Sequence, residues 1–297
     1  MNLLKTFNNM VDKRLISPPK WMASNFHYLV YSGSRSYGCQ QDESDVDVTG
    51  WCIPPKHVVF PHLAGAIQGF GDQGEKFESW QEHHCKDPNG GDKQYDFGVY
   101  NIVHYFKLLM DNNPDKLDTL FVPEFCISHI TETGRLVRDN RKMFLHKGAF
   151  SRFRGYSMSQ YKKMQSKEFT NEKRKADVEK YSYSTKFGAH LVRLLLECEQ
   201  ILVEGDLDPL RNKEVLKSIR RGDWTLEQIT KWMEEKNIQL EKAYSESTLP
   251  DRPDEVKIKG LLINCLESHY GSLSNAVYLP ERFEDAIRNI QKIVSNL

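Results

Sequence analysis

The segment YSGSRSYGCQQDESDVDVTG, residues 31–50, brings a Gly-Ser turn close to two aspartates that are one residue apart. Gly33 and Ser34 follow an apolar run, and ten residues separate them from Asp45 and Asp47. Glycine allows a ligand to approach the backbone closely, and free N–H groups at the start of a helical turn attract phosphate. The serine hydroxyl adds a hydrogen-bond donor. This turn therefore predicts a site for a phosphate group.

The two aspartates suit a divalent metal. Asp45 and Asp47 are at positions i and i+2, so on a β-strand their side chains project from the same face. Neighbouring carboxylates repel one another unless a cation lies between them, and their oxygens suit Mg²⁺ or Mn²⁺. Asp96, in the apolar run QYDFGVY (residues 94–100), is a third acid whose place among apolar residues needs a reason. Together these features predict two-metal phosphoryl or nucleotidyl transfer, with the ions about 3.5–4 Å apart.

Each feature also has an ordinary interpretation. A single Asp-x-Asp is most often a solvated turn, and the site is favoured only by the order of strand, Gly-Ser, Asp-x-Asp and later strand acid. The DFG at residues 96–98 is not a kinase motif, because no glycine-rich loop, strand lysine or HRD segment accompanies it. His83-His84-Cys85 resembles a metal cluster, but three adjacent residues do not easily converge on one tetrahedral ion.

The first part of the chain predicts a small sheet that would position these acids. Apolar, β-branched and aromatic segments are expected to be strands at residues 26–33, 46–53 and 94–100. Residues 61–93 are expected to be a hairpin or an insertion, with a turn at Pro88-Asn89-Gly90-Gly91. The periodicity of residues 101–110 predicts a helix that Asn113-Pro114 ends.

The second part of the chain has a helical period. Helices are expected within residues 129–145, around 153–164, and within 181–205, 225–247 and 284–297. Gly205 is expected to cap one of them, and Thr225 with Gln228 forms the pattern of a capping box. We therefore expect an α+β protein, with a catalytic domain at residues 1–125 and an all-helical domain at residues 126–297.

Composition excludes several classes of protein. Of the 297 residues 39% are apolar, and no run approaches the roughly 18 consecutive apolar residues of a membrane span. The first residues lack the basic-then-apolar order of a secretory signal and predict a short amphipathic helix. The six cysteines are scattered without a C-x-x-C pair, which argues against a zinc ribbon and favours reduced thiols in a cytoplasm.

Positive charge is concentrated in the middle of the chain. The whole chain has 41 basic and 41 acidic residues, but residues 151–193 have 11 basic against 4 acidic. The stretch also contains four tyrosines: Tyr156, Tyr161, Tyr181 and Tyr183. Basic and aromatic residues together suit phosphates and stacked bases, although a solvated helix face and packed tyrosines are the alternative. Arg152, Arg154, Lys162 and Lys163 are the candidates for contacts to an RNA backbone.

These motifs together resemble the DNA polymerase β-like nucleotidyltransferase superfamily. More specifically, the chain is similar to the predicted nucleotidyltransferase family found beside RNA-ligase repair genes in bacteria and phages. The similar motifs span roughly residues 26–270 and are GSRSYG, SDVDVTGW, YDFGVYNIVHYFKLLMDNNPDKLDTLF, STKFGAHLVRLL, IRRGDW and LP. The chain departs from that family at Asp118, where the family often has glutamate, and in the insertion at residues 61–93.

The resemblance implies a polymerase-β-like palm and a Mg²⁺-dependent transfer of NMP from an NTP, with release of pyrophosphate. Gly33, Ser34 and Lys186 would bind the triphosphate, and Lys186 shares a helix face with His190 and Arg193 at positions i, i+4 and i+7. A solvated helix stripe is the alternative for Lys186. The metal ligands and catalytic residues would be Asp45, Asp47 and Asp96, with Asp96 orienting or deprotonating the acceptor hydroxyl.

The expected acceptor is an RNA 3′ end, such as that of a tRNA, in a cytoplasm that would be the host's for a phage protein. A protein hydroxyl, or a small molecule such as an aminoglycoside, is the alternative acceptor. A non-catalytic module that binds nucleotide or RNA is the alternative from a different functional class.

Overall fold

The structure is a computed structural model, and it describes residues 2–40, 45–60, 76–166 and 172–272, together with Ile290, Ile293 and Val294. The strands are β1 (Phe26–Tyr31), β2 (Val46–Cys52), β3 (Ser79–Lys86), β4 (Gln94–Asn101) and β5 (Ile127–Ile130). The α-helices are α1 (Leu3–Asp12), α2 (Lys56–Val59), α3 (Ile102–Met110), α4 (Pro114–Leu120), α5 (Glu132–Asp139), α6 (Ala149–Gln165), α7 (Glu172–Tyr181), α8 (Thr185–Glu204), α9 (Lys213–Arg221), α10 (Leu226–Glu246) and α11 (Glu255–Tyr270). Short 3₁₀ turns are η1 (Met22–Ser24), η2 (Gly33–Arg35), η4 (Glu124–Cys126) and η5 (Arg141–Phe144).

The described strands form one mixed sheet in the order β3-β4-β2-β1-β5. The central pair, β2 and β4, is parallel, and the other pairs are antiparallel. In the parallel pair Asp47 lies directly opposite Asp96. With the helices that follow, this sheet makes the chain an α+β protein, as the sequence predicts.

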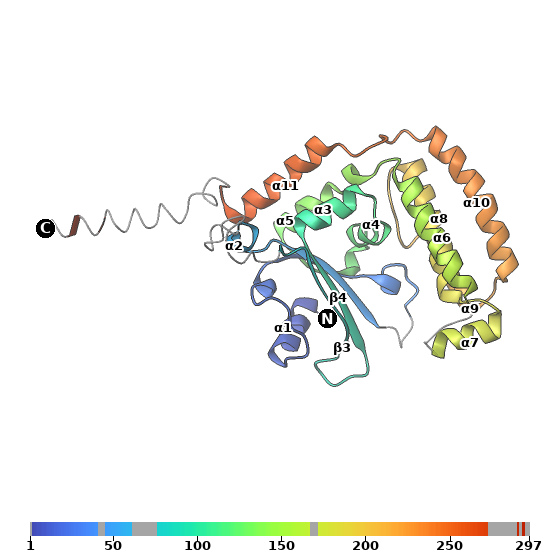
Figure 1. Ribbon diagram of the computed structural model, residues 1–297, viewed down its shortest axis with the longest axis horizontal. Helices are drawn as coiled ribbons and strands as arrows, with labels where there is room; N and C mark the ends of the chain where they lie inside the picture. Colours follow the sequence, from blue (N-terminus) through green and yellow to red (C-terminus); the bar gives the residue numbers. More distant parts are fainter. Residues whose placement is uncertain are drawn as a thin grey trace.

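Different helices cover the two faces of the sheet (Figure 1). Phe97 of β4 packs edge-on against Phe7 of α1, with ring centroids 5.7 Å apart. Tyr100 points to the opposite face, because strand side chains alternate, and its ring lies 6.4 Å from that of Tyr105 in α3. Asp96 is four residues before Tyr100 and therefore shares its face. The acids thus lie on the side of the sheet that carries α3, away from α1.

Residues 127–130 correct the sequence analysis, which placed them in an all-helical part of the chain. They form β5, which pairs with β1 at the edge of the sheet. Only after the N-cap Thr131, whose side chain accepts a hydrogen bond from Gly134 N, does helix α5 begin. A four-residue strand is too short to show a period, and its partner lies far away in the sequence. The division at residues 125 and 126 into two domains stays a prediction.

Asn113-Pro114 has a different role from the one expected. Helix α3 already ends at Met110, and Pro114 is the first residue of α4, where the Asn113 side chain accepts a hydrogen bond from Lys116 N. A proline at the first helical position loses no hydrogen bond, because that N–H has no partner within the helix. The pair therefore starts a helix rather than ending one.

The hairpin expected within residues 61–93 is confirmed where the structure describes it, since β3 and β4 are antiparallel neighbours joined by a turn at residues 88–90. Residues 61–75 lie outside the described part of the chain.

The helical half is built around α8, which packs against α6, α9 and α10. Its C-terminus is capped by Gly205 in the left-handed conformation, with φ of 60°, as predicted. Thr225 and Gln228 form the predicted capping box at the start of α10. Helix α11 packs on α5 and α3 and completes an arc with α10 over the sheet (Figure 1). Most of the helix predicted at residues 284–297 lies outside the described residues.

None of the described helices combines the length and the apolar character that crossing a bilayer requires.

Candidate active site

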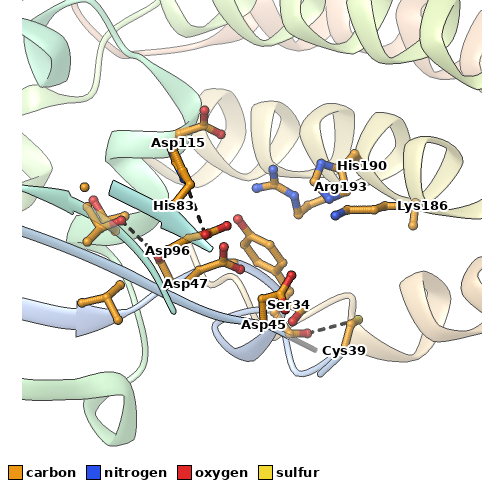
Figure 2. Close-up of a pocket in the computed structure, with 18 of the residues that line it drawn as sticks. Ser34, Cys39, Asp45, Asp47, His83, Asp96, Asp115, Lys186, His190 and Arg193 are labelled. Atoms are coloured by element: carbon orange, nitrogen blue, oxygen red, sulfur yellow. Dashed lines mark hydrogen bonds and ion pairs between the residues drawn. The ribbon is translucent and has the colours of Figure 1, made fainter. Parts of the chain in front are cut away.

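A cavity of about 830 Å³ lies between the sheet and the helical half of the chain (Figure 2). All of the predicted site residues line it: Gly33, Ser34, Asp45, Asp47, Asp96 and Lys186. They come from the η2 turn, from β2 and the residue before it, from β4, and from the first turn of α8. The fold therefore brings together residues that are far apart in the sequence, while the role of each stays a prediction.

Asp47 and Asp96 lie side by side because they are register partners on parallel strands. Asp45 is exposed just before β2, and the other two are half-buried. Burial raises the pKa of the Asp47 carboxyl, the negative charge of Asp96 raises it further, and the positive charge of Lys186 opposes both effects. Two carboxylates in such a place favour a cation between them.

The chemistry of these three acids fits a divalent metal such as Mg²⁺. Within the described residues, no group of three or more His, Cys, Asp or Glu side chains is already assembled around a common position. Asp96 Oδ1 accepts a hydrogen bond from His84 N at 2.7 Å and lies 3.6 Å from His83 Nδ1. Both contacts involve the same oxygen of Asp96, Oδ1. The acids fit a hard cation because they offer oxygen ligands and because all three line the same cavity.

A β-bulge brings two histidines to the same cavity. The register of β3 against β4 shifts between Glu82 and Cys85, and His84 has a positive φ of 56°. As a result His83 and His84 line the cavity, whereas Cys85 is buried in the core. The three adjacent side chains therefore do not all point to one place. Sequence analysis gave neither histidine a role, because a bulge has no clear signal in one sequence.

Gly33 lies against Asp47. Its φ is 61°, and a Cβ on it would overlap the carboxylate, lying 2.7 Å from Asp47 Cγ. The turn is closed by Ser36, whose N–H and hydroxyl both donate to the carbonyl of Gly33. Only glycine combines this backbone conformation with this approach. The Gly-Ser turn and the Asp-x-Asp strand are therefore one structural unit.

Helix α8 forms the opposite wall. Lys186, His190 and Arg193 all line the cavity, which confirms that they share one face of a helix (Figure 2). Lys186 and His190 face the acids across the cavity, as Figure 2 shows, with Asp115 of α4 nearby. Asp115 and Asp177 add two further carboxylates to the lining that the sequence analysis did not identify.

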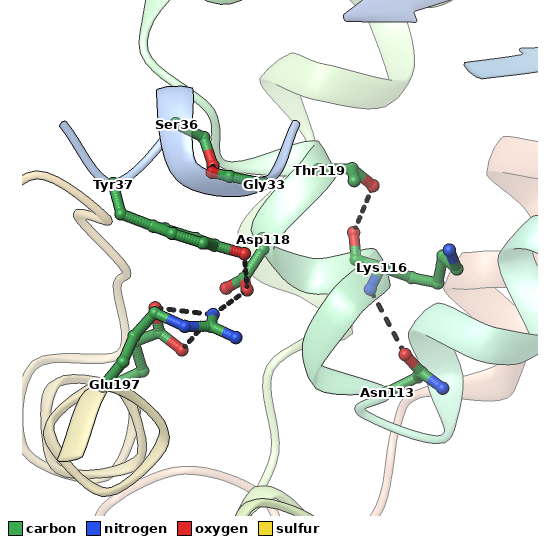
Figure 3. A network of polar contacts seen from close by, with 9 residues as sticks. Gly33, Ser36, Tyr37, Asn113, Lys116, Asp118, Thr119 and Glu197 are labelled. Atoms are coloured by element: carbon green, nitrogen blue, oxygen red, sulfur yellow. Dashed lines mark hydrogen bonds and ion pairs between the residues drawn. The ribbon is translucent and has the colours of Figure 1, made fainter. Parts of the chain in front are cut away.

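Arg193 lines the cavity and also belongs to a buried network with Tyr37, Asp118 and Glu197, which Figure 3 labels. Its guanidinium forms an ion pair with Asp118 and donates to both oxygens of Glu197, at 3.1 and 3.0 Å. The Tyr37 hydroxyl donates to Asp118 at 3.1 Å, and the guanidinium carbon lies 4.1 Å from the centre of the Tyr37 ring. The network joins the loop after η2 to α4 and α8.

Burial dominates the electrostatics of this network. It raises the pKa of both the Asp118 and the Glu197 carboxyls, and the charge of Arg193 opposes the rise. Two carboxylates share one cation in a buried region, and removal from bulk solvent disfavours the charged form of both acids. The sequence analysis noted Asp118 only as a departure from the family. The sequence did contain one signal of this network. Arg193 and Glu197 are opposite charges at positions i and i+4 inside the apolar run LVRLLLECEQIL.

The basic residues predicted to bind RNA separate into two groups. Arg154 is 3.5 Å from Glu241 of α10 and stacks over the ring of Phe150, so it contributes to packing between helices. Arg152 and Lys163 instead line a second cavity of about 630 Å³ on α6 and α8. In the positive stretch, Arg154 therefore contributes to helix packing, whereas Arg152 and Lys163 line a cavity.

The sequence of the chain matches the model of a known protein family. Residues 21–251, more than half of the chain, match the model of the RNA repair pathway DNA polymerase beta family. The "Uncharacterized 38.9 kDa protein in nrdC-mobD intergenic region" of Enterobacteria phage T4 is 28% identical over 121 residues. That match covers 38% of this chain and 31% of the phage protein, so the chain spans about a third of its length.

One solved structure is also similar, the crystal structure of a nucleotidyltransferase-like protein from Exiguobacterium sibiricum 255-15. The alignment covers 82% of this chain and 74% of the other, at 8% sequence identity and a TM-score of 0.29. A score of this size describes only a weak likeness, so the family assignment rests on the family model.

Proposed function

Because this chain belongs to the RNA repair pathway DNA polymerase beta family, we propose that it is a nucleotidyltransferase that adds NMP to the 3′ end of an RNA. The observation that carries the proposal is that six residues, predicted from sequence to bind triphosphate and metal, line one cavity. The family is of the polymerase-β type that the motifs resemble. The division near residue 125 into a catalytic domain and a helical domain, predicted as residues 1–125 and 126–297, is part of the proposal, with the correction that β5 at residues 127–130 belongs to the sheet of the catalytic domain.

The NTP would bind with its triphosphate between the η2 turn and α8. Gly33 leaves room for phosphate oxygens at the backbone, Ser34 offers a hydroxyl, and Lys186 contributes a positive charge from the facing wall. Mg²⁺, or Mn²⁺, would be held by Asp45, Asp47 and Asp96 and would neutralise charge on the phosphates and lower the pKa of the acceptor hydroxyl.

The reaction is a displacement at the α-phosphorus. The acceptor hydroxyl oxygen forms a bond to that phosphorus, and the bond to the bridging oxygen of pyrophosphate breaks. Asp96 would orient the acceptor hydroxyl and receive its proton, and it is held for this role by the hydrogen bond from His84 N. Lys186 would stabilise the charge of the leaving pyrophosphate.

The choice of RNA as acceptor rests on charge and on the family. Residues 151–193 have an excess of seven positive charges, and two of them, Arg152 and Lys163, lie in a cavity that adjoins the first. Positive side chains beside an aromatic ring suit a nucleic-acid backbone and its bases. A cytoplasmic location, the host's for a phage protein, follows from this choice of acceptor.

Incubation of the protein with each labelled NTP, a divalent metal, and total cellular RNA plus protein tests the proposal. We expect label in the RNA fraction with Mg²⁺, and none with EDTA or with the double variant Asp45→Ala/Asp47→Ala. Label in the protein fraction, or on a small molecule, would replace RNA as the acceptor. If the double variant retained its biological activity, a non-catalytic binding module would become the better proposal.

A further inference from the structure

The second cavity adjoins the first along a shared wall. It has a volume of about 630 Å³ and lies along α6. Three residues line both cavities: Asp115, His190 and Arg193. A ligand that lay along α6 would therefore reach these three shared residues. The predicted catalytic acids line the cavity on their other side.

One face of α6 supplies the polar groups of this second cavity. Arg152, Tyr156, Ser159 and Lys163 follow one another at intervals of three or four residues, which places them on the same side of a helix. They offer two positive charges, two hydroxyls and one aromatic ring. This combination suits phosphodiester groups that alternate with bases.

Two of these side chains are held in place by the end of α3 and the start of α4. Arg152 Nε donates to the carbonyl of Asp111 at 3.1 Å, and its Nη2 lies 3.6 Å from Asp111 Oδ1. The Tyr156 hydroxyl accepts a hydrogen bond from Asn113 Nδ2 at 3.1 Å. The segment Asp111–Asn113 therefore fixes a cation and a ring at the rim of the cavity before any ligand binds.

Gly155 keeps the space beside this face open. A Cβ built there would meet no atom within 4 Å, so packing does not require glycine at this position. Glycine inside a helix is less stable than alanine by roughly 1 kcal/mol, and therefore its presence needs a reason. A reason that the cavity supplies is room for a ligand against the helix.

We propose that this second cavity is the acceptor subsite, where the phosphodiester backbone of single-stranded RNA binds next to its 3′ end. The proposal rests on the proposed function and adds the path of the acceptor. The strand would lie along α6, contact Arg152 and Lys163 through its phosphates, and pass Asp115 and His190 to place its 3′ hydroxyl in the first cavity.

The test fills the cavity without removing a contact. Gly155→Leu is compared with Gly260→Leu, because Gly260 of α11 also has open space at its Cβ position and does not line this cavity. Binding of a fluorescent single-stranded RNA is measured by anisotropy, and binding of a labelled NTP and the melting temperature are measured alongside. We expect Gly155→Leu to weaken RNA binding at least tenfold without changing NTP binding, and Gly260→Leu to change neither.

Ser159→Glu gives a second variant that does not depend on packing, because Ser159 is exposed. Its negative charge should also weaken RNA binding while NTP binding stays unchanged. RNA that binds the wild type and both α6 variants equally would overturn the acceptor subsite alone. RNA that fails to bind even the wild type would overturn the RNA acceptor and the subsite together, so the two failures are distinguishable.

Discussion

Gly33 of the η2 turn lies directly against the carboxylate of Asp47 on β2, so closely that a Cβ on the glycine would overlap it. The turn predicted to bind phosphate and the strand that carries a predicted metal ligand are therefore packed as one unit. The turn follows the end of β1 directly, and β2, which carries Asp47, pairs antiparallel with β1.

Gly33→Ala should abolish nucleotidyl transfer. The new methyl group would push the Asp47 carboxylate away, and alanine at φ of 61° costs about 1–2 kcal/mol of stability. Gly38→Ala is the matched control, because Gly38 has φ of 67° but its Cβ would lie 3.3 Å from Leu210 rather than against an acid. Activity assays and thermal unfolding should show similar losses of stability and a loss of activity only at Gly33.

Lys186→Ala should raise the apparent KM for NTP and leave RNA binding nearly intact. A charge-assisted hydrogen bond to phosphate contributes on the order of 1.5–3 kcal/mol, which corresponds to a change of about tenfold to one hundredfold. Lys162→Ala is the control, since Lys162 is an exposed lysine of α6 outside the lining of both cavities. An unchanged KM for NTP in Lys186→Ala would show that the lysine belongs only to a solvated stripe.

Arg193→Met should destabilise the protein by about 3–5 kcal/mol, because it leaves the buried Asp118 and Glu197 without their cation. Adding Glu197→Gln to this variant should recover part of the loss. The control is Arg211→Met, since Arg211 is paired with Glu204 at the surface, where a salt bridge contributes about 1 kcal/mol or less. Urea unfolding measures all three. Equal losses for Arg193→Met and Arg211→Met would contradict the role of the network in joining α8 to α4.

Acidification should destabilise the contact between α11 and the sheet. His27 of β1 is buried, and its Nε2 lies 2.9 Å from His269 Nδ1 of α11. Burial, and then the charges of His269 and His129, lower the pKa of His27 from 6.5 to about 4. The unfolded state therefore binds more protons between these values, so stability is fully present above pH 6.5 and is lost as the pH falls toward 4, by at most ~3 kcal/mol.

Melting temperatures measured between pH 7.5 and pH 4 at roughly half-unit steps check this dependence. His27→Gln should reduce the fall of the melting temperature at acidic pH. It should also lower stability at neutral pH through lost packing against Trp51. His57→Gln, at an exposed histidine of α2, should leave the curve unchanged. If the melting temperature of His27→Gln fell at acidic pH as much as that of the wild type, the pH dependence would belong to other groups.

Local interactions determined what the sequence could predict. The capping box at Thr225 and Gln228, the glycine cap at Gly205 and the strand that carries Asp47 each depend on residues within a few positions of one another. Their physical causes are hydrogen bonds and side-chain periods that a short segment contains entirely.

The tertiary structure decided the features that depend on contacts between distant segments. Residues 127–130 become β5 only because β1 offers an open edge, and His84 reaches Asp96 only through a bulge in the pairing of β3 with β4. The periodicity of α8 predicted that Arg193 shares a face with Lys186. Docking of that helix against α4 and the loop after η2 then buried the arginine with Asp118, because a charge removed from water is stabilised only where opposite charges from other segments meet it.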